Sequence, residues 1–365
     1  VSVLNALEGR IVDGPLSGSE VFVDLNESLN RDSDELSATS DQSGYFKLKE
    51  TDILSMYTPK LLSIGGKDIV TDKELTHLAL IADFPSDTSK DSYLTPVSTV
   101  LASANSTEEK NKILEALGLT ISVADVLALD PWAQSLDGQA SAIELQRKNA
   151  QIGLVIQTVG EMVLTETFSN SSTANIVKVS ESVAAQLVNL SGTQSTIDLT
   201  DPVTVGSVMS ASIEAVDSAS SLTSEQINAV ATNLTEVVSL LEEADVGPTS
   251  ATAAQIITSG QSVLLKKVSD LADGVINLET FDQDTSLSTL FEGNTLVAEM
   301  NKFANAVDSD GDGFADLIDG SPLDSASTTS ESVSSNNATG TLLIDVGNGS
   351  EGFFDNCEFG ECRFE

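Results

Sequence analysis

The chain has few of the residues from which catalytic centres are commonly built. It contains a single His, two Cys, one Trp and three Tyr in 365 residues. A zinc or iron site made of imidazole and thiolate groups needs several such ligands, so these counts nearly exclude one. His77 lies inside an apolar segment, which fits a core or strand-surface histidine better than a general base.

Basic residues are scarce as well. Lys and Arg total 17 against 56 Asp and Glu, so the formal net charge is -39. A surface of this kind repels DNA, RNA and anionic lipid, because few residues are left to form a basic groove. It attracts divalent cations instead. We therefore expect no nucleic-acid partner.

Long apolar runs are also missing. The longest, residues 152–164, is interrupted by Gln157 and Glu161, whereas a spanning helix needs about 20 apolar residues. Hydrophobic residues still make up 40% of the chain, which is enough for a folded core. The chain begins at Val1 without a visible signal peptide. We predict a secreted, soluble protein that does not insert into a membrane and whose leader has been removed.

Residues 1–93 have the pattern of a small β-sandwich. Short segments in which apolar and polar residues alternate, such as residues 20–24, are separated by turns rich in Gly, Asp and Ser. Short strands at this spacing are typical of two packed sheets. Further strands are predicted within residues 9–18, 44–48, 61–64 and 75–82.

Residues 94–307 have the pattern of an all-α domain. Pro96 stands where the first turn of a helix is expected, and Gly118 stands where a second helix should end. A capping box at residues 106–109 marks the start of that second helix, and another at residues 223–226 marks the start of a longer one. The longer predicted helices cover residues 139–168, 172–190, 203–219, 223–245, 250–276 and 285–306.

The strongest motif is an Asp-rich loop that begins at residue 308. A calcium ion takes about six to eight oxygen ligands, and a loop of about twelve residues supplies them at alternate positions. Gly313 stands at the sixth position, where the backbone must turn sharply. Carboxylates this close repel one another unless a cation lies between them. The predicted calcium ligands are Asp308, Asp310, Asp312, the carbonyl oxygen of Phe314, Asp316 and Asp319.

This loop resembles the calcium loops of thrombospondin type 3 repeats and dockerins, which also carry Asp where an EF-hand carries Glu. The resemblance covers residues 308–324. A dockerin has a second such loop one helix away, and none follows here. The resemblance therefore implies a single calcium clamp at a domain boundary.

A second candidate calcium loop lies between residues 24 and 35. Its sixth position is Leu29, where a calcium loop normally has Gly. An acidic hairpin loop without an ion is the alternative, and both interpretations stay open. Read at the same offsets, the ligands would be Asp24, Asn26, Ser28, the carbonyl oxygen of Asn30, Asp32 and Glu35.

The segments on either side of this second loop resemble secreted bacterial β-sandwich modules. Residues 9–18 and 39–46 are similar to carboxypeptidase-regulatory-like domains and to the calcium-binding B-type repeats of surface adhesins. The resemblance covers about the first 50 residues. It implies structural calcium rather than catalysis.

The C-terminal part is rich in Ser, Thr and Asn at residues 325–340 and then becomes apolar. Cys357 and Cys362 are either reduced thiols or a small disulfide, and export favours the disulfide. A candidate apolar strand covers residues 341–346. It either pairs with a neighbouring copy by strand donation or folds back onto its own chain. The residues that strand donation would bury in the neighbouring copy are Leu342, Leu343, Ile344 and Val346.

The predicted fold class is α+β with several domains. A β-sandwich (1–93) precedes an all-α helical domain (94–307), a calcium loop (308–324), a linker (325–340) and a C-terminal β segment with a disulfide (341–365). We predict no enzyme. The predicted function is a structural subunit of a calcium-stabilised extracellular filament, sheath or surface layer built from copies of itself. The alternative is a monomeric calcium-dependent adhesin or anchoring module that binds a glycan or a cell surface.

Overall fold

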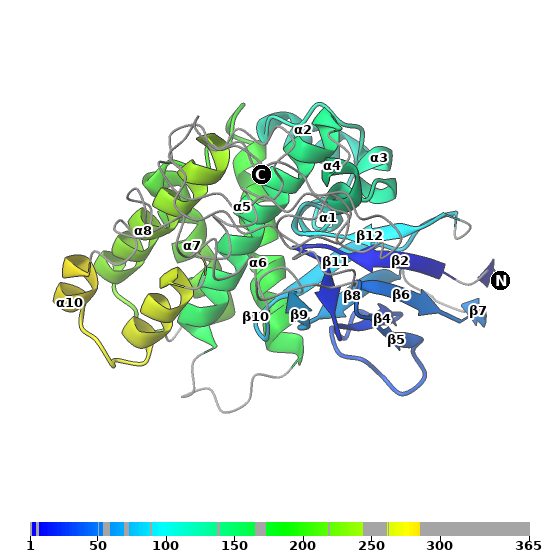
Figure 1. The fold of residues 1–365 in the computed structure, drawn as a ribbon, viewed down its shortest axis with the longest axis horizontal. Helices are drawn as coiled ribbons and strands as arrows, with labels where there is room; N and C mark the ends of the chain where they lie inside the picture. Colours follow the sequence, from blue (N-terminus) through cyan, green and yellow to red (C-terminus); the bar gives the residue numbers. More distant parts are fainter. Residues whose placement is uncertain are drawn as a thin grey trace, which may run out of the picture.

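The structure is a computed structural model whose described residues form strands up to Leu94 and helices from Pro96 to Gln283 (Figure 1). This is the mixed α+β class that the sequence predicts. The predicted calcium loop at 308–319, the linker, the C-terminal strand, both cysteines and the predicted helix at 285–306 lie outside the described residues. The structure describes residues 2–4, 7–49, 51–53, 59–68, 73–87, 90–136, 139–164, 173–217, 220–243, 261 and 263–284.

The strands form small sheets that are antiparallel except at one place. Their orders are β1-β7, β10-β9-β3, β11-β8-β4-β5 and β12-β2-β6. The strands are β1 (Ser2–Leu4), β2 (Leu7–Ile11), β3 (Leu16–Ser17), β4 (Glu20–Asp24), β5 (Ser37–Thr39), β6 (Tyr45–Leu48), β7 (Thr51–Ile53), β8 (Lys60–Ile64), β9 (Lys67–Asp68), β10 (Lys73–Glu74), β11 (Ala79–Asp83) and β12 (Ser92–Leu94).

The exception is β12, which runs parallel to β2 and places Ser92 opposite Gly9. A Cβ atom on Gly9 would come within 1.9 Å of the Ser92 carbonyl oxygen, so glycine permits this close approach. The chain then continues directly into α1 (Pro96–Ala102), whose first turn is capped by Thr95. The predicted helix start at Pro96 is confirmed.

One edge of the four-stranded sheet is covered by helices. The N–H of Ile81 on β11 donates to Thr99 Oγ1 at 2.9 Å, and Ser98 Oγ donates to the Ile81 carbonyl at 2.8 Å. The N–H of Ala79 donates to Ser180 Oγ at 3.4 Å. Since these hydroxyl groups satisfy main-chain groups that a further strand would use, side chains of α1 and α6 close this edge.

The longer helices begin and end close to where the sequence predicts, whereas the short helices at residues 123–128, 131–136 and 278–283 were not predicted. The capping box at Thr223 is reciprocal: Thr223 N–H donates to Gln226 Oε1 at 2.9 Å, and Gln226 N–H donates to Thr223 Oγ1 at 3.2 Å. Residues 263–272 are helical as well. The remaining helices are α2 (Thr107–Ala116), α3 (Val123–Ala128), α4 (Pro131–Leu136), α5 (Ala140–Val163), α6 (Thr173–Ser191), α7 (Pro202–Val216), α8 (Ser224–Glu243) and α10 (Leu278–Gln283).

The predicted strand at 75–82 is only partly correct. Residues 75–78 form a turn in which Leu75 N–H donates to Gly66 O at 2.8 Å and Leu78 N–H donates to Leu75 O at 3.3 Å. Leu75 and Leu78 are buried, with 5% and 1% of their surface exposed. Two buried leucines in a turn therefore extended the apolar pattern beyond β11.

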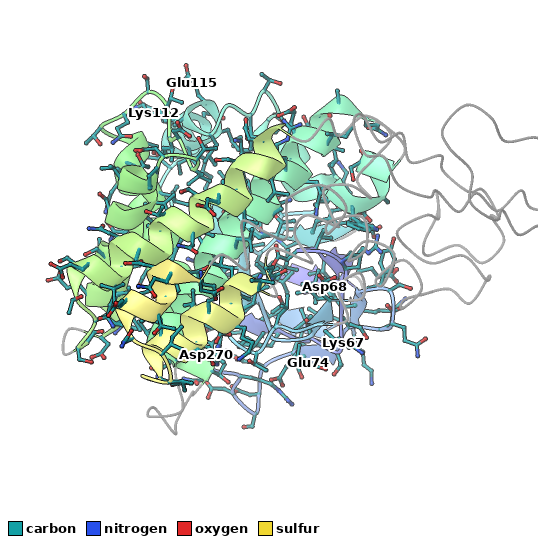
Figure 2. All side chains as sticks on the ribbon, turned by 60° about the vertical axis from the view of Figure 1, so that its left-hand side comes forward. Lys67, Asp68, Glu74, Lys112, Glu115 and Asp270 are labelled. Carbon is teal, nitrogen blue, oxygen red and sulfur yellow. The ribbon has the colours of Figure 1, made fainter. Side chains whose placement is uncertain are left out.

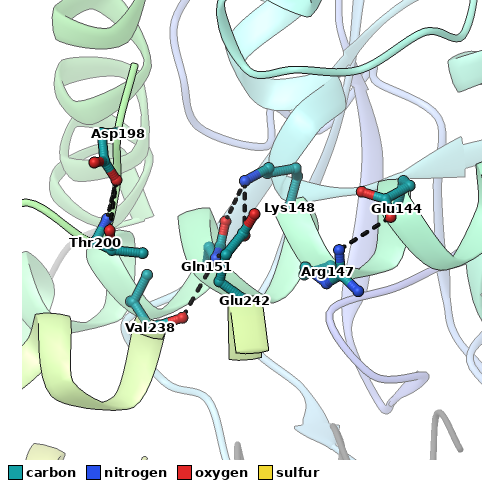
Figure 3. A network of polar contacts seen from close by, with 8 residues as sticks. All are labelled: Glu144, Arg147, Lys148, Gln151, Asp198, Thr200, Val238 and Glu242. Atoms are coloured by element: carbon teal, nitrogen blue, oxygen red, sulfur yellow. Dashed lines mark hydrogen bonds and ion pairs between the residues drawn. The ribbon is translucent and has the colours of Figure 1, made fainter. Parts of the chain in front are cut away.

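Helices α5 and α6 lie between the strands and the pair α7 and α8 (Figure 1). Buried apolar residues from strands and helices form one contiguous cluster. Two side chains of α5 bind one carboxylate of α8: Lys148 Nζ and Gln151 Nε2 both donate to Glu242 Oε2, at 3.0 and 2.9 Å (Figure 3). Burial opposes the charge on Glu242, but the hydrogen bond and the charge of Lys148 prevail and lower the pKa of that carboxyl group.

A buried arginine joins the strands to α4. Arg10 on β2 is 0% exposed, and its Nη1 lies 3.2 Å from Asp130 Oδ2. Its Nε donates to the Ser43 carbonyl at 2.8 Å, and the guanidinium stands 4.9 Å from the centre of the Tyr45 ring. Asp130 Oδ1 also accepts from the Trp132 N–H at 3.1 Å, so one carboxylate pairs with Arg10 and caps the first turn of α4.

Candidate functional site

The loop between β4 and β5 holds the second predicted calcium site, and Asp24 organises its first half. Asp24 is the last residue of β4 and is 4% exposed. Its Oδ1 accepts from the N–H groups of Asn26 and Ser28, both at 3.2 Å, and its Oδ2 accepts from Leu29 N–H at 3.1 Å. A single buried carboxylate thus bends the chain around itself.

Glu35 closes the other end of the loop. Its Oε1 accepts from Leu25 N–H at 2.8 Å, and its Oε2 accepts from Asp32 N–H at 3.0 Å. Glu35 is 8% exposed. Because the two oxygens bind main-chain groups on opposite sides of the loop, this carboxylate fixes where the loop begins and ends.

Between these two carboxylates, several polar atoms gather inside the loop. Ser28 Oγ lies 2.9 Å from the Asn30 carbonyl oxygen and 3.2 Å from Asp32 Oδ2, and Asn26 Nδ2 lies 2.8 Å from the same Asp32 oxygen. Oxygen ligands at about 2.4 Å from a calcium ion and about 72–90° apart are separated by about 2.8–3.4 Å. The separations inside the loop are those of hydrogen bonds, in which Ser28 Oγ donates to the Asn30 carbonyl and to Asp32 Oδ2 and Asn26 Nδ2 donates to Asp32 Oδ2, so the polar atoms are held together without an ion.

Leu29 adopts the backbone conformation that a calcium loop normally gives to glycine. Leu29 and Glu27 are the non-glycine residues with positive φ among the described residues, each at 60°. A side chain in this left-handed region costs about 1–2 kcal/mol, so the surrounding contacts must hold it there. The presence of Leu at this position therefore does not prevent the turn.

The loop lies close to a carboxylate on α6 that sequence reasoning missed. Burial raises the pKa of Glu181, and the charges of Asp24 and Glu27 raise it further, whereas Lys60 acts in the opposite direction. No local pattern in the sequence could connect Glu181 with residues 24–35, because folding alone brings α6 to this loop. The neighbourhood is therefore more acidic than the loop sequence indicates.

Among the described residues, no group of three or more His, Cys, Asp or Glu side chains is placed to hold a metal ion. The gathered atoms of the loop belong mainly to Asn26, Ser28, Asn30 and Asp32, while Asp24 and Glu35 bind the main chain. Calcium binding by this loop therefore remains a prediction. The same is true of the loop at residues 308–319, which lies outside the described residues.

A cavity of about 230 Å³ lies between the strands and the helix at residues 263–272. Lys67, Asp68 and Glu74 are grouped on β9 and β10, next to the helix that carries Asp270 (Figure 2). The lining residues are Glu74, Leu75, Glu161, Gln261, Leu265, Lys266 and Ser269.

His77 contacts Glu161 of α5, one of the residues that line this cavity. Its Nδ1 is 3.2 Å from Glu161 Oε1, and 20% of its side chain is exposed. The imidazole therefore meets a carboxylate rather than a serine or cysteine nucleophile. This contact fits the structural role that the sequence favours for the one histidine of the chain.

No family model matches the chain, and no curated protein or solved structure shows a significant match to it. Within the part of the chain that the structure describes, none of the helices combines the length and the apolar character needed to cross a bilayer.

Proposed function

We propose that this protein is a non-enzymatic structural component of an extracellular or cell-surface assembly, and that calcium stabilises its fold. The observation that carries the proposal is the loop at residues 24–35, in which hydroxyl, carbonyl and carboxylate oxygen atoms gather around a turn held by two buried carboxylates. The net charge of -39 also favours the binding of divalent cations.

The proposed layout is an N-terminal β-sandwich, an all-α domain, a second calcium loop at residues 308–319 and a C-terminal segment that joins copies of the protein. In this arrangement calcium rigidifies both ends of the helical domain. The ligands are oxygen atoms from carboxylates, amides, hydroxyls and carbonyls, which is the set that calcium prefers.

Asp32→Asn is the sharpest test of the loop at residues 24–35. Asn can still accept the hydrogen bonds from Asn26 and Ser28, so the variant removes one negative charge and keeps the loop geometry. A ligand that binds only the native state adds about 2.7 kcal/mol at a hundred times its Kd. We expect calcium to raise the melting temperature (Tm) of the wild-type protein by several degrees relative to chelator, and by less in Asp32→Asn.

Asp34→Asn is the matched control for that experiment. Asp34 is exposed, lies in the same loop, and stands outside the predicted ligand positions. It changes the net charge by the same amount. If both variants lose the same share of the calcium effect, the effect comes from general charge and not from this loop.

The loop at residues 308–319 is tested separately with Asp310→Ala combined with Asp312→Ala. Each of the two predicted loops should carry part of the calcium effect, so the double variant should retain the part that Asp32→Asn removes. Equal melting curves with and without calcium in the wild-type protein would show that neither loop binds the ion.

Assembly is tested by electron microscopy of the full chain with and without calcium. We expect filaments or sheets with calcium, whereas single particles under both conditions favour a monomeric adhesin. β11 is closed by α1 and α6, whereas β5 lies at the opposite edge of the same sheet and carries the exposed Thr39. A strand donated from residues 341–346 would therefore pair with β5. Removing residues 325–365 should leave a folded protein that no longer assembles.

A further inference from the structure

The first contact of interest joins the turn after β2 to α5. Asp13 is 7% exposed, and its Oδ2 accepts from Gln157 Nε2 at 2.7 Å. One turn earlier on α5, a Cβ atom on Gly153 would stand 2.2 Å from Asp13 Oδ1, so the missing side chain makes room for the carboxyl group. The side chain of Gln157 also accepts a hydrogen bond from Gln261 Nε2.

A second carboxyl group lies beside the same turn. Asp68 on β9 is 3% exposed, and a Cβ atom on Gly14 would come within 2.4 Å of its Oδ1. Burial, and after it the charge of Asp68, raises the pKa of the Asp13 carboxyl well above its usual range, while the hydrogen bond from Gln157 acts in the opposite direction. Gln157 is neutral, so it cannot compensate a charge on Asp13.

The other contact lies two turns further along α5. A Cβ atom on Gly160 would stand 2.9 Å from His77 Cβ, so glycine again allows a close approach. His77 Nδ1 lies 3.2 Å from Glu161 Oε1, and this contact is an ion pair only while the imidazole carries its second proton. Glu74 and Lys266 are the other charged groups that line the adjoining cavity.

We propose that this junction between the strands and α5 is a pH-dependent contact, firmest in acidic solution and loosened as a proton leaves Asp13. A buried Asp13 stabilises the folded chain while it is neutral, which holds fully below the usual range of an aspartate, and this stability is lost as the pH rises through its raised pKa.

The test must separate this contact from the repulsion among all carboxylates of a chain with a net charge of -39. Asp13→Asn keeps an acceptor for Gln157 and is neutral at every pH. The matched control is Glu214→Gln, which removes one charge from an exposed position on α7. Melting temperatures of the full chain are measured from pH 5 to pH 8.5 in chelator, so that calcium does not enter the comparison.

We expect the Tm of Asp13→Asn relative to the wild-type protein to rise by about 2–4 °C between pH 5 and pH 8.5. Glu214→Gln should show a small difference that does not grow with pH. A difference between Asp13→Asn and wild type that is constant with pH, or a loss of Tm at pH 8.5, overturns the proposal.

Hydrogen exchange of the wild-type chain gives an answer even if the variant does not fold. After correction for the intrinsic exchange rate, the amides of α5 should lose protection between pH 5 and pH 8.5 relative to those of α7. A parallel loss in α5 and α7 contradicts the proposal, because general repulsion acts on both helices.

Discussion

The strands are held to the helices by two buried charged contacts of opposite character. At one, Arg10 meets Asp130 at 3.2 Å and the two charges attract. At the other, Asp13 and Asp68 lie beside one turn, and the two groups would repel one another if both were ionised. Both pairs are buried, so the difference lies in the sign of the partner and not in the access of water.

This difference decides how each contact responds to pH. A guanidinium remains protonated at any pH at which the protein is folded, so the Arg10 contact is permanent. The Asp13 contact depends on a proton that the solvent can remove. The molecule therefore has a fixed attachment near α4 and an adjustable attachment along α5.

The largest expected effect comes from breaking the attracting pair. Asp130→Asn keeps a cap for α4 but leaves Arg10 buried without its counter-charge, which typically costs about 3–5 kcal/mol. Chemical denaturation at pH 6 and pH 8 should give the same loss at both values. The double variant Arg10→Met with Asp130→Asn should recover part of the stability, because it leaves no buried charge; equal instability of the single and double variants would contradict this account.

Gly153→Ala tests the close approach on which the adjustable contact depends. The added methyl group would stand 2.2 Å from Asp13 Oδ1, and overpacking of this kind costs about 1–3 kcal/mol. Gly192→Ala is the matched control, since its nearest neighbour would be 3.4 Å away. We expect Gly192→Ala to be neutral or slightly stabilising in a urea titration, and a similar loss in both variants would show that the Asp13 contact does not depend on Gly153.

Contacts between uncharged groups of the strands and helices should not respond to pH. Thr99→Val keeps the shape of a side chain that is 0% exposed but removes the acceptor for Ile81 N–H. A buried main-chain donor left without a partner costs about 1–3 kcal/mol, and no proton is involved. Urea titrations at pH 5 and pH 8 should therefore give equal losses; a loss that changes with pH would mean that the α1 contact also titrates.

The smallest effect is expected for a charge pair that water reaches. Glu242→Gln removes the partner of Lys148 at a contact in which the Glu242 side chain is 43% exposed. Pairs of this kind contribute about 0–1 kcal/mol and weaken with salt. Urea titrations in low and high salt should show a small loss that salt reduces further, and a loss as large as that of Asp130→Asn would refute the view that burial sets the scale.

The sequence predicts the parts of this fold that depend on neighbouring residues. Alternation identifies β4 and β6, and the capping box at Thr223 marks the start of α8 because both its bonds lie within one turn. The sequence also identifies the polar loop at residues 24–35. The left-handed conformation of Leu29 depends on Asp24, however, and could not be foreseen from the residue type.

Contacts between distant segments could not be foreseen in the same way. Nothing near Arg10 indicates that it is buried, because its partner Asp130 lies 120 residues away, just before α4. The Asp13 carboxyl likewise gains its surroundings only when β9 and α5 close over the turn. Charged residues are normally predicted at the surface, so both sites contradict the local signal and only the folded chain explains them.

The parallel pairing of β12 with β2 also sets a time order for making the protein. Gly9 pairs with Ser92, so β2 leaves the ribosome long before its parallel neighbour exists. At roughly 5–20 residues per second, that neighbour follows about 4–16 s later. Once residues 45–48 have been made, β2 has β6 on one side only, and Arg10 still lacks Asp130. A nascent chain that stalls before residue 92 therefore presents β2 with one of its edges still unpaired.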